Sequence, residues 1–257
     1  MITVALRIRT LLAVGGVVVV SVGLAGCGAD PSDAPAEHKS FALSGKTLTV
    51  DSDTSSVELV PADVKSVEVT RRVDGWVFMG NGPDSSWSMK NDELTLRLKC
   101  SGISSDCQAR HQIKVPRGVK VVVKDGNGSV TATGFDTPLD LWSGNGKVVV
   151  RDSSGALKMG SANGAIVADN VSSRKVTANS NNGEVRLTLT VAPDRVEGIS
   201  DNGAVEIALP TKPGLEYRVD ARTSHGNDKI SVPKSDASSH VVRARSDNGE
   251  VTVRSAN

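Results

Sequence analysis

A short motif built around an Asn-Gly pair recurs along the second half of the chain at nearly constant spacing. The glycines of these motifs, together with Gly226 of the variant motif TSHGNDKI, are separated by 18, 18, 19, 20, 23 and 23 residues. A repeat of this length restricts the chain to folds in which one supersecondary unit is used many times. The six Asn-Gly pairs are Asn127 and Gly128, Asn145 and Gly146, Asn163 and Gly164, Asn182 and Gly183, Asn202 and Gly203, and Asn248 and Gly249.

Apolar residues occupy alternate positions on both sides of each motif. The position two residues after the glycine is Val or Ile in every copy except the variant one, where Asp228 stands. A period of two predicts a strand before the turn and a strand after it, each with one buried face. A degenerate copy over 48–59, with Ser55 in the place of the glycine, fits the same columns.

The repeats can be interpreted in two ways. Asn-Gly is a common turn in antiparallel hairpins, so each copy could be one hairpin of a meander or barrel. Copies that repeat in register favour a parallel solenoid instead, because equivalent residues then stack about 4.8 Å apart. We therefore predict an all-β chain that forms a parallel β-solenoid of about seven to eight rungs over 41–257, with the asparagines stacked in a ladder. The closing residues VTVRSAN are expected to run directly out of the last rung.

Residues 60–118 interrupt the repeat with an aperiodic β insertion. Candidate strands at 67–73, 76–79, 86–90, 94–99 and 112–115 are separated by turns rich in Gly, Asn, Pro and Ser. Since the open end of a sheet recruits other strands, we expect this insertion to cap or flank the solenoid.

The insertion also carries a close pair of cysteines, Cys100 and Cys107. In an exported chain such a pair is most simply a disulfide. Two free thiols are an alternative. A metal site is disfavoured because only His111 lies close in sequence and further ligands are missing; we expect no metal.

The N-terminus has the layout of an export signal. Residues 1–26 contain Arg7 and Arg9, no acidic residue and an apolar run over 11–23 that is short for a membrane-spanning helix. The sequence Leu-Ala-Gly-Cys that follows is similar to a bacterial lipobox, so Cys27 is expected to carry a diacylglyceryl and acyl anchor after cleavage; the alternative is an ordinary signal peptide with a chance cysteine. Residues 27–40 then read as a lipidated, flexible tether on the extracytoplasmic face of the cell membrane.

The lipobox, the segment IKVPRGVKVVVKDGNGSV and the recurrent S-x-N-G-x-V-x-V together resemble the actinobacterial lipoproteins of the domain-of-unknown-function 4097 family. These are called adhesins and are related to the "toast-rack" β-solenoid domains. The likeness covers about residues 40–257. It implies the solenoid architecture and an adhesion or binding role, with envelope-stress sensing in some members, and it supplies no catalytic residues.

Charge and residue pattern exclude several function classes. With Lys+Arg 30 against Asp+Glu 29, the chain lacks the positive charge that nucleic acid would require. Charged residues beside the turns alternate in sign, and the four histidines lie in unrelated contexts, so an enzyme acting on polysaccharides is disfavoured. We expect no cofactor apart from the acyl anchor.

A surface that binds an envelope protein or a glycan is the preferred function. Its candidate residues are Trp76, Trp87 and Trp142, since exposed aromatic rings suit sugars and protein partners. The alternative for Trp76 and Trp87 is packing within the cap, whereas Trp142 follows an inward position and should point outward. A purely structural spacer in the envelope is the second candidate function.

Overall fold

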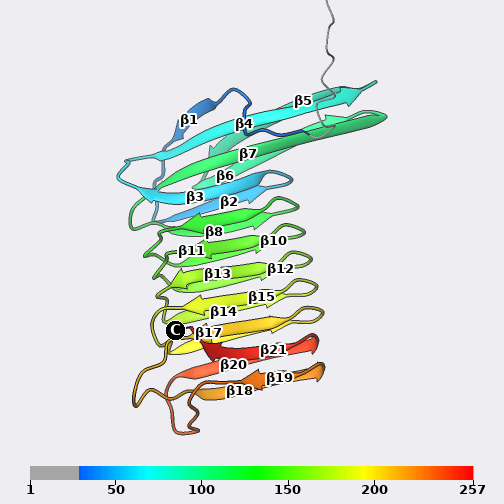
Figure 1. Ribbon diagram of the computed structural model, residues 1–257. Helices are drawn as coiled ribbons and strands as arrows, with labels where there is room; N and C mark the ends of the chain where they lie inside the picture. Colours follow the sequence, from blue (N-terminus) through cyan, green and yellow to red (C-terminus); the bar gives the residue numbers. More distant parts are fainter. Residues whose placement is uncertain (1–28, 257) are drawn as a thin grey trace, which may run out of the picture.

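The computed structural model describes residues 29–256, and every regular element in this range is a β-strand. The strands form two sheets, one on each side of a narrow core (Figure 1). Sheet A contains, in spatial order, β1 (Glu37–Phe41), β4 (Val67–Phe78), β7 (Ser104–Pro116), β3 (Ser56–Ala62), β9 (Val130–Thr133), β11 (Val148–Arg151), β13 (Ile166–Val171), β15 (Val185–Leu189), β17 (Val205–Leu209), β21 (Val251–Ser255) and β19 (Asp228–Ile230). Sheet B contains β18 (Arg218–His225), β20 (Val241–Asn248), β16 (Arg195–Ser200), β14 (Lys175–Ser180), β12 (Leu157–Ser161), β10 (Leu139–Ser143), β8 (Lys120–Asp125), β2 (Thr47–Ser52), β6 (Glu93–Ser101) and β5 (Asn81–Lys90). No helix within residues 29–256 is long and apolar enough to cross a bilayer.

Each repeat contributes one strand to each sheet, and its Asn-Gly turn connects the two sheets. Equivalent strands of successive repeats pair in parallel and in register, so that Leu141 lies between Val123 and Met159. The turns therefore join the two faces of a rung and do not form hairpins within one sheet (Figure 1). The predicted parallel β-solenoid is confirmed, and the hairpin meander is wrong.

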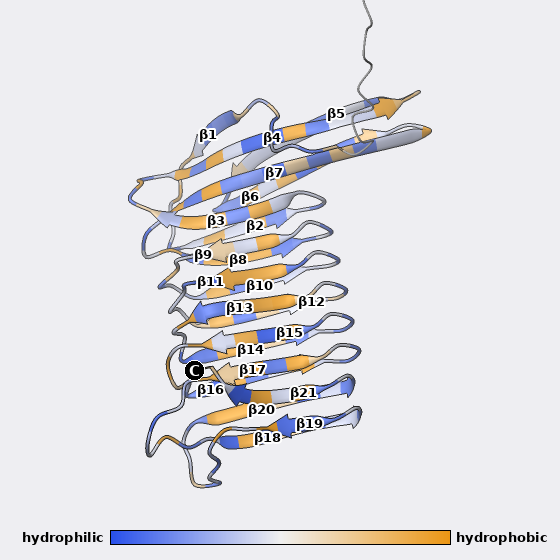
Figure 2. Cartoon of the chain, in the orientation of Figure 1, coloured by the Kyte–Doolittle hydropathy of each residue, from blue (hydrophilic) through white to orange (hydrophobic). Residues whose placement is uncertain are grey.

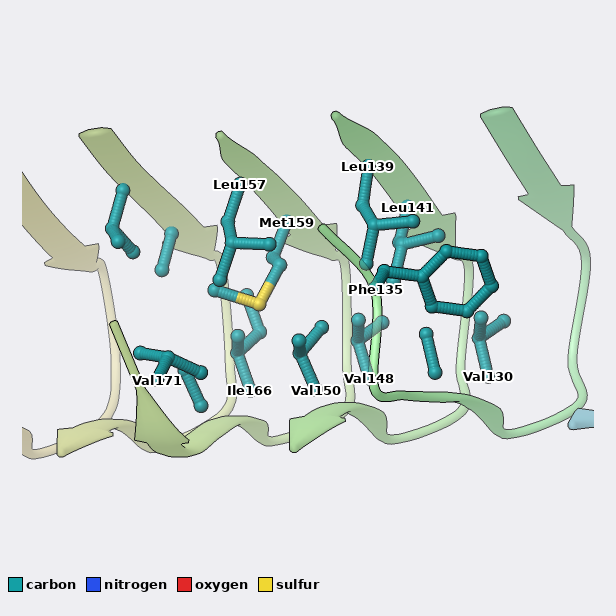
Figure 3. Close-up of a cluster of buried hydrophobic side chains, with 14 of the residues drawn as sticks. Val130, Phe135, Leu139, Leu141, Val148, Val150, Leu157, Met159, Ile166 and Val171 are labelled. Carbon is teal, nitrogen blue, oxygen red and sulfur yellow. The ribbon is translucent and has the colours of Figure 1, made fainter. Parts of the chain in front are cut away.

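The inward columns of both sheets form one continuous hydrophobic core. Figure 3 shows Leu139 and Leu157 of sheet B facing Val148 and Ile166 of sheet A, with Phe135 filling the space at one edge. Figure 2 shows the apolar residues concentrated in the strands of the stacked rungs. Burial of each such side chain contributes about 1.5–3 kcal/mol, which explains why a core of small aliphatic residues suffices.

The aperiodic insertion closes the first end of the solenoid. Strand β6 pairs in parallel with β2, and β7 pairs in parallel with β3, so these two strands add a rung that has no Asn-Gly turn. Strands β4 and β5 then cover this rung in antiparallel pairing. All four strands are longer than those of the repeats and project beyond them as an arm (Figure 1).

The two last copies of the repeat are stacked in reverse order. Strands β20 and β21, the final copy, pair with β16 and β17, and the preceding copy, β18 and β19, lies outside them. The expectation that the final residues run out of the last rung is therefore wrong. The reason lies in Asp228, because a carboxylate in an inward column is tolerated only at the solvated end of the stack.

The N-terminal segment contacts the insertion at residues that precede the expected start of the solenoid domain at residue 41. Strand β1 pairs antiparallel with β4, and Ala29 and Pro31 are buried on the arm. A flexible tether over 27–40 therefore does not describe residues 37–40, which pair in β1, or Ala29 and Asp30, whose N–H groups donate to Asp106 and Asp74. The predicted signal peptide, residues 1–26, and Cys27 lie outside the described residues.

Candidate functional site

The turns of the solenoid are joined by a column of buried serine hydroxyls. Ser161 accepts a hydrogen bond from the N–H of Gly164 over 2.8 Å and donates one to the carbonyl of Gly146 over 3.1 Å. The same two bonds recur at Ser143 and Ser180. Glycine is required at 146 because a Cβ there would collide with the carbonyl oxygen of Gly128 on the next rung. These polar groups are therefore used within the fold.

A ladder of asparagine amides runs beside the serines. Asn163 Nδ2 donates to Oδ1 of Asn145 over 2.6 Å, and Asn163 Oδ1 accepts from Nδ2 of Asn182 over 2.7 Å. The ladder continues to Asn127 at one end and to Asn202 and Asn248 at the other. Each amide inside the ladder donates to one neighbouring asparagine and accepts from the other, so the turn asparagines hold the rungs together.

Asp125 takes the serine position in the first Asn-Gly turn. Its Oδ1 accepts a hydrogen bond from the N–H of Gly128, and its Oδ2 is buried without a hydrogen bond to any described residue. Burial raises the pKa of this carboxyl, an effect that the nearby Ser52 hydroxyl and the Gly128 N–H partly offset. The carboxyl is therefore part of the hydrogen bonding of the turn.

The cap encloses Trp87 and His111. The Arg71 guanidinium carbon lies 4.2 Å from the centroid of the Trp87 ring, and the Phe41 ring meets it edge-on at 6.2 Å. His111 is 1% exposed, and neither ring nitrogen has a hydrogen-bond partner among the described residues. Burial and the positive charge of Arg71 lower the pKa of His111 to about 4. Trp87 therefore packs within the cap, as the alternative interpretation of this residue expects.

Trp76 and the cysteine pair lie on the arm. Cys100 of β6 and Cys107 of β7 form a disulfide with a Cα–Cα distance of 6.5 Å, which joins the two sheets where they extend beyond the repeats. The predicted disulfide is thus present. Trp76 projects from the outer face of β4 and is half-exposed.

Trp142 lies on the outer face of sheet B, as the alternation of β10 requires. Its backbone pairs with Lys124 on one side and Gly160 on the other. The indole ring lies over Gly160, where any side chain would collide with the ring. A shallow groove of about 360 Å³ lies beside the ring and is lined by Gly160 among others. We call this surface the Trp142 groove.

Polar side chains surround the Trp142 groove. Asp140 and Lys158 form an ion pair over 3.1 Å along one side. Lys124 lies on the rung before the ring, and Asn179 lies beyond Gly160. An aromatic face with a carboxylate, two ammonium groups and an amide around it offers both an apolar platform and directional hydrogen bonds, the combination that small-molecule sites use.

Sequence reasoning identified Trp142 and missed the rest of the groove. The other members with polar side chains are Lys124, Asp140, Lys158 and Asn179, and Gly160 also lines the groove. A signal was available in the position four residues before each turn glycine, where Lys124, Trp142, Gly160 and Asn179 follow one another. Trp142 and Gly160 occupy the same outward position in successive copies of the repeat. Once the copies are known to stack in parallel and in register, an aromatic residue beside a glycine in this column predicts a depression in the surface of the sheet.

The histidines and charged residues of the described part of the chain are dispersed. Within residues 29–256, no group of three or more His, Cys, Asp or Glu residues is placed to hold a metal ion. Two of the histidines are engaged separately, His38 with Thr70 and His240 with the carbonyl of Pro193. Outward charges are paired across neighbouring rungs, as Arg186 and Arg254 are with Glu206.

Comparison with known proteins supports the same architecture. The fold is similar to that of a candidate adhesin from Bacteroides fragilis NCTC 9343, with a TM-score of 0.54 and 13% sequence identity, covering 88% of this chain and 98% of that one. It is also similar to a candidate adhesin from Parabacteroides distasonis ATCC 8503, with a TM-score of 0.53 and 14% identity over 87% of this chain and 98% of that one. At such identities the likeness shows the fold alone. No curated protein sequence matches the chain significantly.

The family assignment is more specific. The family described as Toastrack DUF4097 matches residues 65–254, which include most of the insertion and all the Asn-Gly turns. This match confirms the resemblance found in the sequence. The chain therefore belongs to the Toastrack DUF4097 family.

Proposed function

We propose that this chain is a non-enzymatic binding protein of the bacterial envelope, and that the Trp142 groove binds one or more sugar residues of a polysaccharide. The observation that carries the proposal is the placement of an indole face beside a groove lined by paired and amide side chains. The names of the similar structures, candidate adhesins, are consistent with such a role.

The chemistry of the groove fits a sugar. The C–H face of a pyranose ring packs against the indole of Trp142, while its hydroxyl groups reach Asp140, Lys158 and Asn179. The ion pair between Asp140 and Lys158 holds the carboxylate and the ammonium group ready to accept and donate these bonds. The groove is open on one face of the sheet, as binding within a long polymer requires.

The proposed location is the extracytoplasmic face of the cell membrane, with a lipid anchor on Cys27. The lipobox-like sequence that ends at Cys27 supports this assignment. Two or three acyl chains would hold the protein firmly, since each buried methylene contributes about 0.8 kcal/mol. In cells grown with labelled palmitate, the Cys27→Ala variant should lose the label and leave the membrane fraction. Label that persists in this variant would contradict the anchor.

The groove is tested by binding to purified bacterial cell wall. The Trp142→Ala variant should lose at least about tenfold in affinity, equivalent to about 1.4 kcal/mol. The Trp76→Ala variant is the matched control, because Trp76 and Trp142 are 46% and 43% exposed. Equal binding of cell wall by wild type and Trp142→Ala would refute the proposal that the Trp142 groove binds sugar.

A structural spacer remains the second candidate. The observation that favours it is the pairing of several outward charges between neighbouring rungs, such as Arg186 and Arg254 with Glu206. A spacer predicts no retention of the wild-type protein on cell wall, together with normal membrane attachment. The same binding experiment therefore separates the two functions.

A further inference from the structure

The end of the arm carries most of the exposed apolar surface of the described chain. Trp76, Phe78, Met79 and Ile103 are 46%, 57%, 71% and 75% exposed, and the other exposed large apolar residues within 29–256, Val60, Trp142 and Val191, are less accessible at 43%, 43% and 39%. Figure 2 shows the hydrophobic end of the arm standing clear of the rungs. We call these four residues the arm tip. Apolar residues gathered at the end of a projection mark an interaction surface, since single exposed ones would be scattered.

The arm tip is held in shape from within. The N–H of Ile103 donates to the carbonyl of Phe78 over 3.1 Å, which joins the ends of β7 and β4. Gly80 and Gly102 pass so close that a side chain on either would collide with backbone. The disulfide described above braces the two layers behind this contact. The apolar side chains are therefore excluded from the interior and point outward.

The backbone conformation of Met79 is a second observation that indicates an interaction surface at the arm tip. Its φ is 50°, in the left-handed region that residues with a Cβ rarely occupy. Such a conformation costs about 1–3 kcal/mol elsewhere in proteins and is typically found where function requires it. Here the residue in this conformation directly follows β4 and carries a long apolar side chain that is 71% exposed.

The N-terminal segment approaches the arm tip as it nears Cys27. The N–H of Asp30 donates to Asp74 over 2.8 Å, and the N–H of Ala29 donates to Asp106 over 2.9 Å. Asp74 pairs with Gln108, whereas Asp106 pairs with Trp76, nearer the tip. From Asp30 to Ala29, in the direction of the N-terminus, the chain therefore runs along the arm toward the arm tip. Cys27 is two residues further on, a reach of at most about 7 Å.

We propose that the arm tip inserts into the interface of the lipid bilayer beside the anchored N-terminus. The inference rests on the proposed anchor at Cys27 for bringing the tip to the membrane, and on the exposed side chains for the contact itself. Tryptophan is favoured at the headgroup level, and Phe, Met and Ile suit the acyl region below it. Acyl chain and arm tip form two contacts, which fix the orientation of the rod where one flexible anchor would not.

The contact is apolar in character. Asp30, Asp74 and Asp106 lie behind the tip, so anionic lipids gain nothing from it electrostatically. Docking should therefore occur on zwitterionic phosphatidylcholine and should be insensitive to salt. The connection between β6 and β7 lies at the same edge as the Asn-Gly turns, so the docked arm directs the asparagine ladder toward the bilayer (Figure 1).

The test uses the full chain reconstituted in phosphatidylcholine vesicles that contain lipids with brominated acyl chains. Bromine quenches tryptophan fluorescence only at short range, so quenching reports the depth of an indole. We expect quenching of wild type and of Trp142→Phe to be at least twice that of Trp76→Phe. A second variant, Met79→Ser with Ile103→Ser, keeps Trp76 as reporter and should lose most of its quenching while its circular dichroism stays unchanged.

Attachment is measured separately by flotation of the same vesicles. A chain that floats but shows equal quenching in wild type and Trp76→Phe overturns insertion of the tip and leaves the anchor intact. Floating protein that is cross-linked through its tips without quenching identifies a second copy as the occupant and also overturns the proposal. Protein that does not float contradicts the anchor and the docking together, whereas the proposed sugar binding by the Trp142 groove is unaffected by each of these results.

Discussion

The side-chain amide of Asn248 donates a hydrogen bond to Oδ1 of Asn202 over 2.9 Å, although 46 residues separate them in the chain. Elsewhere in the ladder, bonded asparagines are 18 to 20 residues apart. The final copy of the repeat therefore inserts directly on the rung that ends at Leu209 and displaces the preceding copy to the open end. The rung with the irregular motif has only one neighbour as a result.

This order predicts opposite effects of exchanging Val and Asp in one inward column. Val251 is fully buried between Val205 and Asp228, its partners in sheet A. Val251→Asp should lower the free energy of unfolding by about 3–5 kcal/mol, since it leaves a buried charge without a partner. Asp228→Val should be neutral or stabilising. Urea unfolding of both variants measures the difference, and equal destabilisation would contradict the reversed order.

The asparagine ladder should contribute measurably to stability. Asn163→Ala removes one donated and one accepted amide hydrogen bond and should lower the free energy of unfolding by about 1–2 kcal/mol. Asn181→Ala is the matched control, because this turn residue lies outside the ladder. Thermal unfolding followed by circular dichroism compares the two. A loss in Asn181→Ala as large as that in Asn163→Ala would assign the effect to the turn conformation.

Replacing the buried carboxyl of Asp125 should stabilise the protein at neutral pH. Serine occupies this position in neighbouring turns and satisfies the same glycine N–H. Asp125→Ser should raise the free energy of unfolding by about 1 kcal/mol at pH 7, since an incompletely paired buried group is removed. Because the folded pKa is raised, the wild type binds its proton more tightly when folded. The difference in the free energy of unfolding between Asp125→Ser and wild type should therefore become smaller as the pH falls through the folded pKa. A difference that becomes larger in acid would contradict the raised pKa of Asp125.

His111 should make the fold sensitive to mild acid. Its pKa is about 4 when folded against 6.5 in the unfolded chain, so the unfolded state binds more protons between these values. Its contribution is present above pH 6.5 and is lost as the pH falls toward 4, by about 3 kcal/mol. His111→Leu should flatten this part of the stability profile, measured by urea unfolding at each pH. His38→Leu, which removes an exposed histidine, is the matched control.

Part of the candidate site follows from the sequence and part does not. The outward direction of Trp142 follows from strand alternation, because Leu141 belongs to an inward column. The groove depends on Gly160, which lies beside Trp142 only when the copies stack in parallel and in register. Trp87 could not be separated from Trp76 by pattern, since both lie in the aperiodic insertion. Packing against Arg71 and Phe41 decides that Trp87 belongs to the cap.

The sequence by itself determined the rung. Alternating apolar columns, a short polar side chain three residues before the glycine and the Asn-Gly pair are local patterns, and each copy carries nearly all of them. Only the tertiary structure decided which copies are neighbours, where the insertion adds its rung and how far the arm projects. Nearly identical rungs have nearly identical edges, so strand pairing alone does not fix their order. The copy with a charged residue in an inward column takes the end of the stack that is exposed to solvent. Asp228 at that end and the regular column through Val251 inside it show how that choice is made.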